Sequence, residues 1–469
     1  MLPLWEGWDE YAHFAWLQHW NNENTLPRTT DPISREVDES MRLAPLPREL
    51  RWIGPPYLIH PDWWALPAAE REARAHALQT LSPALANQPA TPINGRPFTF
   101  YEAQQPPLYY WIAATVMRPA AASALSHRVF LMRVLSLFFA SLAIPFVFLA
   151  AREIFGAKSG AVSASYCAAI LAIAPGLVID AAHVANDGLA IGVAALFLWL
   201  MTRGKTGWVA AGLTLGAAIL VKASLLVLAP VLIVLWFRRP KQLGLALTLA
   251  FAIGGWWYIR NVLIGMPLTG WQESVPLGTV AAAAVALFHH GGWINEAHTI
   301  AKSFTWFGAW SFITLRTWMY LIVEGCAFGG MLVGLARMKG LRVPLTIAVC
   351  FTLAIIGGAA AYFAVHNIAG IPGWYLWPAG AALAILIVAG LERLSIAFAA
   401  MLALLDSYGA TARMMPYYAG LAPWNHGSVT QVPEAAARLH VSLWLVAAWL
   451  AATVAIPLLM LQGRPKTRT

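Results

Sequence analysis

The sequence predicts an all-α fold, a polytopic bundle of membrane-spanning helices. Of its 469 residues, 59% are hydrophobic and only 11% are charged. Soluble domains carry about 25% charged residues, so a chain with so few cannot cover a soluble surface. The remaining charges lie mostly between long apolar runs, which is the pattern of a multi-pass membrane protein.

The apolar runs begin at residue 129 and predict about eleven transmembrane helices. A bilayer core of ~30 Å needs about 20 helical residues, and several of these runs are near the lower limit of that length. The predicted spans are 129–151, 160–180, 185–202, 206–221, 223–237, 243–260, 317–336, 343–364, 374–391, 394–407 and 439–461.

The net charge of +9 is distributed between the spans in a way that orients the bundle. Cytoplasmic loops collect Lys and Arg. Basic side chains follow alternate spans, at Arg152 and Lys158, Arg203 and Lys205, Arg238, Arg239 and Lys241, and Arg337, Lys339 and Arg342. We expect these connections to be cytoplasmic and the other connections to face the opposite side. Because this charge pattern is topological, it predicts no nucleic-acid partner.

The orientation divides the chain into four regions. Residues 1–128 form an extracytoplasmic region with interfacial helices, residues 129–261 and 317–469 carry the transmembrane helices, and residues 262–316 form a second extracytoplasmic loop. The last region ends in a short cytoplasmic tail. An amino-terminal region of this length normally crosses a membrane behind a helix or signal, so we expect either a preceding first helix or unaided translocation.

The amino-terminal region is polar and rich in proline. Residues 68–79, AAEREARAHALQ, predict a short surface helix. Residues 106–117, PPLYYWIAATVM, are too few to span a bilayer and predict an interfacial or re-entrant helix.

The chain opens with an acidic cluster, in which Asp9, Glu10 and His13 form a D-E-x-x-H pattern between aromatic residues. A carboxylate can serve as a general base when it lies within hydrogen-bond reach of a hydroxyl proton. The alternative is that Asp9 only caps the helix that follows. Two or three potential ligands within five residues do not specify a metal site, so we assign no metal ligands and leave a divalent cation open as a cofactor.

Two cations stand out because they lie at the predicted external ends of spans, against the charge pattern. They are Lys222 and Arg260. A charge at the edge of a transmembrane segment is a functional hypothesis by default, and an anionic lipid phosphate is its natural partner. The alternative is that both side chains extend to the interface.

Several short stretches, in order along the chain, resemble motifs of the GT-C superfamily of glycosyltransferases. They are P-L-W-E-G-W-D-E-Y-A-H-F (3–14), E-A-Q-Q-P-P-L-Y-Y-W (102–111), A-N-D-G-L-A (185–190), G-A-A-I-L-V-K-A-S (216–224), G-W-W-Y-I-R-N (255–261) and G-W-Y-L-W-P (373–378). In style they are similar to bacterial enzymes akin to protein O-mannosyltransferases and aminoarabinose transferases. The resemblance covers about three-quarters of the chain. Trp374 stands where relatives often carry Arg, and the first helix of the family is absent from this sequence.

The resemblance implies a GT-C-like bundle and a set of site residues. Asp9 would be the base, assisted by Glu10, and Lys222 and Arg260 would hold the donor phosphate. Further substrate contacts are expected from His13, Glu102, Gln105, Tyr109, Tyr110, Asp187 and Tyr375. The residue types alone leave Tyr109 and Tyr110 as ordinary interfacial aromatics and Asp187 as a helix cap.

The first functional hypothesis is an inverting glycosyltransferase. Its donor would be a polyprenyl-phosphate-linked sugar, its acceptor a lipid, glycan or protein, and its place the bacterial inner membrane, with the site on the periplasmic or extracellular side. The alternative is a transporter or flippase of lipid-linked sugars, and a third reading is a non-catalytic partner in envelope assembly. The membrane lipid is the other expected partner. The sequence contains no GxxxxGK[ST] pattern, so nothing in it suggests ATP hydrolysis. The sequence does not specify the oligomeric state.

Overall fold

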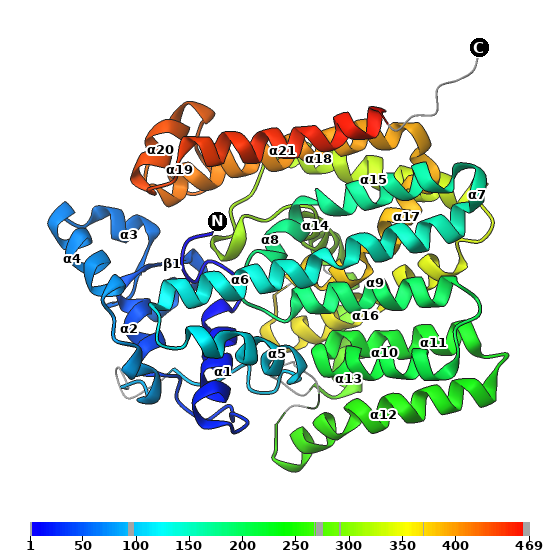
Figure 1. Cartoon of the computed structure of the whole chain (residues 1–469), viewed down its shortest axis with the longest axis horizontal. Coiled ribbons are helices and arrows are strands. Elements are labelled where there is room, and N and C mark those ends of the chain that lie inside the picture. The colour runs from blue at the N-terminus through cyan, green and yellow to red at the C-terminus, as the bar shows by residue number, and fades with distance from the viewer. Residues whose placement is uncertain are drawn as a thin grey trace.

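The computed structural model describes residues 2–91, 98–266, 268, 275–289, 292–368 and 370–462. Over these residues the chain is helical almost throughout, which confirms the predicted all-α class. Its one sheet is a parallel pair of two-residue strands, β1 (Pro45–Leu46) and β2 (Leu58–Ile59), with Pro45 opposite Leu58 and Leu46 opposite Ile59. Figure 1 shows two parts, a group of short helices at one end and a bundle of long, roughly parallel helices.

The short helices come from the first 120 residues, and we call them the cap. They are α1 (Glu10–Glu23), α2 (Arg35–Leu43), α3 (His60–Ala65), α4 (Ala68–Gln79) and α5 (Leu108–Met117). Helix α4 has the bounds predicted for the surface helix, and α5 lies within the predicted interfacial helix. Trp5 and Trp16 are fully buried in one apolar core that continues from the cap into the bundle, so the cap is packed onto the bundle.

The bundle starts at residue 125 and contains both long and short helices. They are α6 (Leu125–Ser141), α7 (Ala143–Ala172), α8 (Pro175–Ala181), α9 (Asp187–Thr202), α10 (Trp208–Val221), α11 (Leu228–Trp236), α12 (Pro240–Leu263), α13 (Leu277–His289), α14 (Gly292–Thr305), α15 (Thr317–Arg337), α16 (Arg342–His366), α17 (Gly380–Leu391), α18 (Ser395–Tyr408), α19 (Met415–Tyr418), α20 (Val432–Arg438) and α21 (Leu443–Gln462). Gly156, with a φ of 74°, interrupts α7 and lets the chain reverse direction there.

Every predicted span forms a helix, but fewer than eleven of these helices are long enough to cross a bilayer. Among the described residues, six pass on length and composition, or seven if the bent pair Gly160–Ala172 and Pro175–Ala181 counts as one span. Three predicted spans form the short apolar helices Asp187–Thr202, Trp208–Val221 and Ala223–Trp236. At ~1.5 Å per residue they reach only ~21–24 Å. The chain is therefore a multi-pass membrane protein with several short helices in its bundle.

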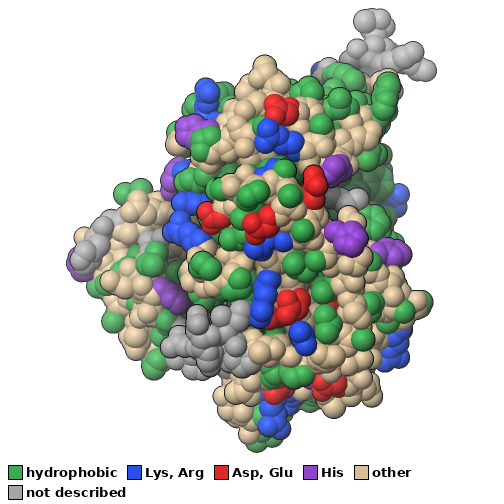
Figure 2. Space-filling model, turned by 90° about the vertical axis from the view of Figure 1, so that its left-hand side faces the viewer, with side chains coloured by type: hydrophobic (Ala, Val, Ile, Leu, Met, Phe, Trp, Pro, Cys, Tyr) green, Lys and Arg blue, Asp and Glu red, His purple; other side chains and the backbone are tan. Residues whose placement is uncertain are grey.

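The outer surfaces of the bundle are apolar, as a lipid-facing surface must be. Exposed large side chains include Phe251 on α12, Leu321 on α15, Leu353 on α16 and Trp444 on α21. The end that carries the cap is different, because Lys, Arg, Asp and Glu side chains gather along the middle of that face (Figure 2). This contrast indicates that the cap faces water while the sides of the bundle face lipid.

The predicted basic connections lie at the opposite end of the bundle from the cap. The connections α9–α10, α11–α12 and α15–α16 all turn at that end, where the described chain also finishes after α21 (Figure 1). The two sets of loops are thus separated as the charge pattern predicts.

Helices α15 and α17 approach each other at a point that only glycine allows. A Cβ on Gly390 would lie 1.9 Å from the Gly330 carbonyl oxygen and 2.6 Å from the Gly334 nitrogen. Small residues at such crossings let helix backbones pack closely inside a membrane.

We expect Gly390→Ala to destabilise the protein, because the added methyl group forces α15 and α17 apart. Overpacking of this kind costs ~1–3 kcal/mol. The measurement is the thermal unfolding midpoint of the purified protein in detergent, which should fall. Gly325→Ala in α15 is the control, since no described atom lies within 4 Å of a Cβ there. An equal midpoint in both variants would contradict this view of the α15–α17 contact.

Candidate functional site

The acidic cluster begins α1, and its first member, Asp9, is half-buried at the N-cap position. The backbone of Asp9 is left-handed (φ 51°), and its side chain accepts no cap hydrogen bond from the described helix backbone. Instead, the Tyr101 hydroxyl donates a hydrogen bond to Asp9 Oδ1. Left-handed backbone at a non-glycine residue is uncommon and often marks a functional position. Its geometry therefore does not support a capping role for Asp9.

The ionisation of Asp9 is tuned toward neutral pH. Burial raises the pKa of Asp9 to about 6, although the Tyr101 hydrogen bond and the positive charge of Lys222 oppose the shift. A base works best when its pKa is near the working pH. Asp9 is thus ionised at pH 7 and binds a proton more readily than an ordinary aspartate.

Glu10, the next residue, has a different environment. It is fully buried, and Arg133 of α6 grips it with two hydrogen bonds, Nε to Oε1 at 2.7 Å and Nη2 to Oε2 at 2.6 Å. The Val184 backbone N–H also donates to Glu10 Oε1 at 3.0 Å. Burial alone would raise the pKa of Glu10, but the Arg133 guanidinium outweighs it and the pKa is lowered. Glu10 is therefore an anchor between α1, α6 and the loop before α9.

His13 and the two tyrosines of α5 lie together behind the acidic cluster. His13 Nδ1 is 2.7 Å from the Tyr110 hydroxyl, and the Tyr109 hydroxyl is 3.0 Å from Ser136 Oγ. Burial lowers the pKa of His13 to about 3, so the imidazole is neutral. Tyr109 and Tyr110 are both fully buried, which differs from the interfacial placement of an aromatic belt.

A second polar group lies where α9 begins and α10 ends. Lys222 Nζ is 2.5 Å from Asp187 Oδ1, and it also lies 5.6 Å from the centre of the Tyr375 ring. Gln105 joins this group to the cap, because its Nε2 donates to Glu102 Oε2 at 2.7 Å and its Oε1 accepts from Asn186 Nδ2 at 3.2 Å.

The pKa of Glu102 is raised further than the pKa of Asp9. Burial and the negative charge of Asp9 raise the pKa of Glu102 to about 8. The carboxyl group therefore stays protonated at pH 7 and can donate a hydrogen bond. Two carboxyl groups with separated pKa values are the pattern expected of a site that both accepts and donates protons.

Of these groups, Gln105, Lys222 and Tyr375 border a cavity of about 140 Å³. Its lining is polar at Gln105, Lys222, Ser224 and Tyr375, and apolar along α16. The apolar lining consists of Ala223, Val227, Phe351, Ala354, Ile355, Gly358 and Ile371. The cavity thus joins a cation to a hydrophobic wall, which suits an amphipathic ligand with an anionic head.

Arg260 lies at the same end of the bundle but outside this lining. Its guanidinium stacks over the Trp257 ring at 4.6 Å and hydrogen-bonds Asn261 Oδ1 at 3.1 Å and the Pro27 carbonyl at 3.4 Å. The cation that influences Asp9 is Lys222. Asp9 and Arg260, to which the resemblance gives roles in one site, share no hydrogen bond or ion pair among the described residues.

Sequence reasoning missed several side chains that build the site. Tyr101 and Arg133 bind the two carboxylates, and the fully buried Glu6 holds His60 at 2.9 Å and Ser311 Oγ at 2.6 Å. Of these residues, only Arg133 could have been identified from the sequence, because an Arg inside an apolar run needs a buried partner.

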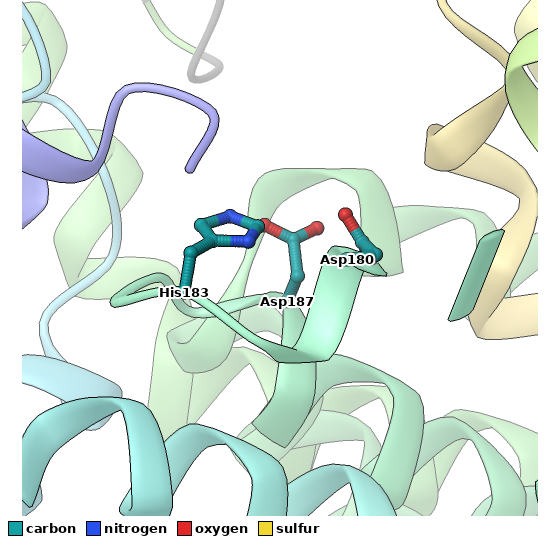
Figure 3. A group of neighbouring side chains, drawn as sticks. All are labelled: Asp180, His183 and Asp187. Atoms are coloured by element: carbon teal, nitrogen blue, oxygen red, sulfur yellow. The ribbon is translucent and has the colours of Figure 1, made fainter. Parts of the chain in front are cut away.

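Three further side chains could hold a metal ion, and Figure 3 shows them on the segment from α8 to α9. They are Asp180, His183 and Asp187, whose ligand atoms all lie within 4.8 Å of one another. The members of the amino-terminal cluster are engaged elsewhere, Asp9 with Tyr101, Glu10 with Arg133 and His13 with Tyr110. Among the described residues, the group that could hold a metal ion therefore lies on the segment from α8 to α9.

Comparison with known proteins gives matches among solved structures only. No family model and no curated protein matches the sequence. ArnT from Cupriavidus metallidurans bound to undecaprenyl phosphate is 17% identical, with a TM-score of 0.47, over 78% of this chain and 63% of that chain. The chain therefore spans less than two thirds of the length of that protein.

Two other matches are of the same kind. ArnT from the same organism in the apo state is 16% identical, with a TM-score of 0.47, over 95% of this chain and 70% of that chain. The Archaeoglobus fulgidus oligosaccharyltransferase in the apo form is 14% identical, with a TM-score of 0.39, over 97% of this chain and 56% of that chain. ArnT is an aminoarabinose transferase, one of the kinds of enzyme that the sequence motifs resemble.

Removing the charge of Glu10 and removing the charge of Asp9 should have different effects on the stability of the protein. Glu10→Gln leaves Arg133 buried without a counter-ion, and breaking a buried ion pair costs ~3–5 kcal/mol. Asp9→Asn removes a charge that burial disfavours, because the folded-state pKa of Asp9 is raised and its ionised form opposes folding above about pH 6. We expect the thermal midpoint at pH 7.5 to fall sharply for Glu10→Gln and to stay level or rise for Asp9→Asn. A comparable fall in both variants would show that Asp9 is also a structural anchor.

Proposed function

We propose that this protein is a membrane-embedded glycosyltransferase that moves a sugar from a polyprenyl-phosphate donor to a lipid, glycan or protein acceptor. The observation that carries the proposal is that Asp9, a half-buried carboxylate with a raised pKa, is influenced by the positive charge of Lys222, a cation in the lining of an amphipathic cavity. The motif resemblance to GT-C glycosyltransferases supports the same reaction class. The site lies at the bundle end opposite the basic loops, which favours the periplasmic or extracellular side of a bacterial inner membrane.

The cavity lining supports a lipid-linked donor over a soluble one. Lys222 offers a positive charge to a phosphate. The apolar lining from α16 begins beside it, so the first isoprene units of a prenyl chain would bury apolar surface there. A nucleotide-linked sugar has no prenyl chain, so it would bury no prenyl surface against this apolar lining.

The proposed reaction is a single displacement. The acceptor hydroxyl gives its proton to the Asp9 carboxylate while its oxygen forms a bond to the anomeric carbon of the sugar. The bond between that carbon and the phosphate oxygen breaks, and its electron pair leaves with the polyprenyl phosphate, whose charge Lys222 stabilises. One displacement inverts the anomeric configuration. Glu102, Gln105 and Tyr375 would contact the sugar, and Glu10, His13, Tyr109 and Tyr110 position the elements that carry Asp9 and Gln105.

Transfer by the wild type should fall as the pH drops through about 6, because Asp9 then binds a proton and no longer accepts one. Asp9→Asn should reduce transfer ~10²- to 10⁴-fold and remove this pH dependence. The assay follows release of polyprenyl phosphate from radiolabelled polyprenyl-phosphate hexoses in proteoliposomes, with a bacterial membrane extract as the acceptor source.

The control for Asp9→Asn is Asp62→Asn, an exposed carboxylate in α3. Full transfer activity of the Asp9→Asn variant would contradict the assignment of Asp9 as the base. If the wild type instead moves the labelled lipid across the vesicle membrane without releasing polyprenyl phosphate, the protein is a transporter. If it does neither, the proposal of an enzyme fails.

Lys222→Met should weaken binding of polyprenyl phosphate, because the cavity then loses its phosphate counter-charge and Asp187 loses its ion pair. We expect at least a tenfold rise in the dissociation constant, measured with polyprenyl phosphate in detergent micelles; one charge-assisted hydrogen bond contributes ~1.5–3 kcal/mol. Lys241→Met, at the basic end of α12, is the matched control. Unchanged binding by Lys222→Met would move the phosphate site elsewhere, with Arg260 as the next position to test.

A further inference from the structure

Another cavity lies at the end of the bundle opposite the cap, and its volume is about 300 Å³. Three connections supply its polar lining: α9–α10 through Gly204 and Thr206, α11–α12 through Arg238 and Arg239, and α15–α16 through Arg342, the first residue of α16. These connections turn at the same end of the bundle in Figure 1. This cavity therefore lies beside the start of α10, whereas the cavity of the proposed donor lies beyond the end of that helix.

Three guanidinium groups give this cavity a strong positive charge. Arg238, Arg239 and Arg342 are all exposed, so a ligand can reach them, and the lining contains no Asp or Glu. Among the described residues, none of the three forms an ion pair with a carboxylate, and Glu392, an acidic residue at this end, pairs with Arg337 instead. The protein therefore supplies this cavity with positive charge and leaves that charge without a partner in the described part of the chain.

Two of these arginines stand at helix starts, where a positive charge is locally unfavourable. Arg239 is the N-cap residue of α12, and Arg342 is the first residue of α16. Neither helix has an acidic residue in its first turn or a side-chain cap. Because the amino-terminal end of a helix carries a partial positive charge, it favours anions over cations. An anion in the cavity would offset the repulsion at both helix starts as well as the charge of the guanidinium groups.

The charge pattern of membrane loops explains only part of this arrangement. That pattern places Lys and Arg at one end of a bundle, but any loop position satisfies it. Arg203, Lys205 and Lys241 stand at the same end without entering the lining. Arg342 is different, because its Nη2 donates a hydrogen bond to the Val234 carbonyl of α11 at 2.9 Å. This bond holds the guanidinium of Arg342 at the cavity rather than leaving it free in solvent.

The apolar side of the cavity favours a lipid over a free phosphate. Leu235, Trp236 and Phe237, at the end of α11, belong to the lining, and the Phe237 side chain is 56% exposed. Ile233 and Val234 continue this exposed apolar surface along α11. Acyl chains attached to an anionic headgroup would bury apolar surface there, which a free phosphate cannot do.

We propose that this cavity binds the phosphate of an anionic membrane lipid, with Arg238, Arg239 and Arg342 around the headgroup and the acyl chains along α11. A guanidinium can hold a phosphate with two parallel hydrogen bonds. Basic pockets between membrane helices are suited to anionic headgroups in this way. The bound lipid would connect the end of α11 with the starts of α12 and α16. This proposal goes beyond the transfer reaction and does not depend on it.

The experiment measures lipid binding to the purified, delipidated protein in detergent micelles by native mass spectrometry. Dioleoyl phosphatidylglycerol is the probe, and the neutral dioleoyl phosphatidylcholine is its control. The wild type should bind one phosphatidylglycerol more tightly than phosphatidylcholine. Arg239→Gln combined with Arg342→Gln should weaken this binding about tenfold or more, because two headgroup cations are lost. Lys205→Gln combined with Lys241→Gln removes the same charge outside the lining and should bind as the wild type does.

Equal phosphatidylglycerol binding by the two double variants overturns the site, because charge at this end would then attract the lipid without the cavity. Loss of binding in Lys222→Met instead of the Arg239 and Arg342 variant places the lipid in the other cavity and also overturns it. Glycerol phosphate, titrated by calorimetry, has the charge without the acyl chains. If it binds as tightly as phosphatidylglycerol, the ligand is a free phosphate and the lipid assignment is overturned.

A thermal measurement keeps the test decisive if the arginine double variant does not fold. Phosphatidylglycerol should raise the unfolding midpoint of the wild type more than phosphatidylcholine does, because a ligand that binds only the folded state stabilises it. Equal midpoints with the two lipids overturn the site. Neither readout depends on sugar transfer, so the proposed function survives this failure.

Discussion

The buried ion pair between Glu10 and Arg133 is the interaction on which the rest of the site depends. It joins the first residue of α1 to the first long helix of the bundle, and Arg133 also donates to the backbone carbonyls of Leu2 and Pro3. The same carboxylate holds the Val184 N–H. This pair of charges therefore connects the segment before α1, α6 and the loop before α9. It helps to fix the position of Asp9 relative to Lys222.

Asp9 and Glu10 have different roles because their backbone conformations differ. Asp9 is left-handed, with φ 51°, whereas Glu10 begins the helix, so their side chains leave the chain in different directions. Glu10 is directed into the interior, where an ion pair stabilises its charge. Asp9 keeps a weaker set of partners, and its charge is less stable. The strong interactions hold the structure together, and the less stabilised charge lies where chemistry is proposed.

Much of this arrangement could be predicted from the sequence, and the failures have physical reasons. Composition and charge spacing predicted the helical class and the separation of loops, because both follow from the bilayer. The sequence pattern could not show that Asp9 and Glu10 have different roles, because it does not reveal the left-handed backbone conformation of Asp9. The Glu10–Arg133 pair spans 123 positions, beyond any local pattern. The stacking of Arg260 on Trp257, outside the cavity lining, could not be predicted from the sequence either.

The shortness of α10 and of the segment that follows has a consequence for where the donor must travel. Both run from the basic end of the bundle to a tip at Lys222, and each contains 14 residues, or ~21 Å of helix. A bilayer core is ~30 Å thick, so helices of this length that begin at one boundary of the core end several ångströms short of the other boundary. Under the proposed function, the phosphate of a donor lipid would therefore reach Lys222 only below the level of the neighbouring headgroups.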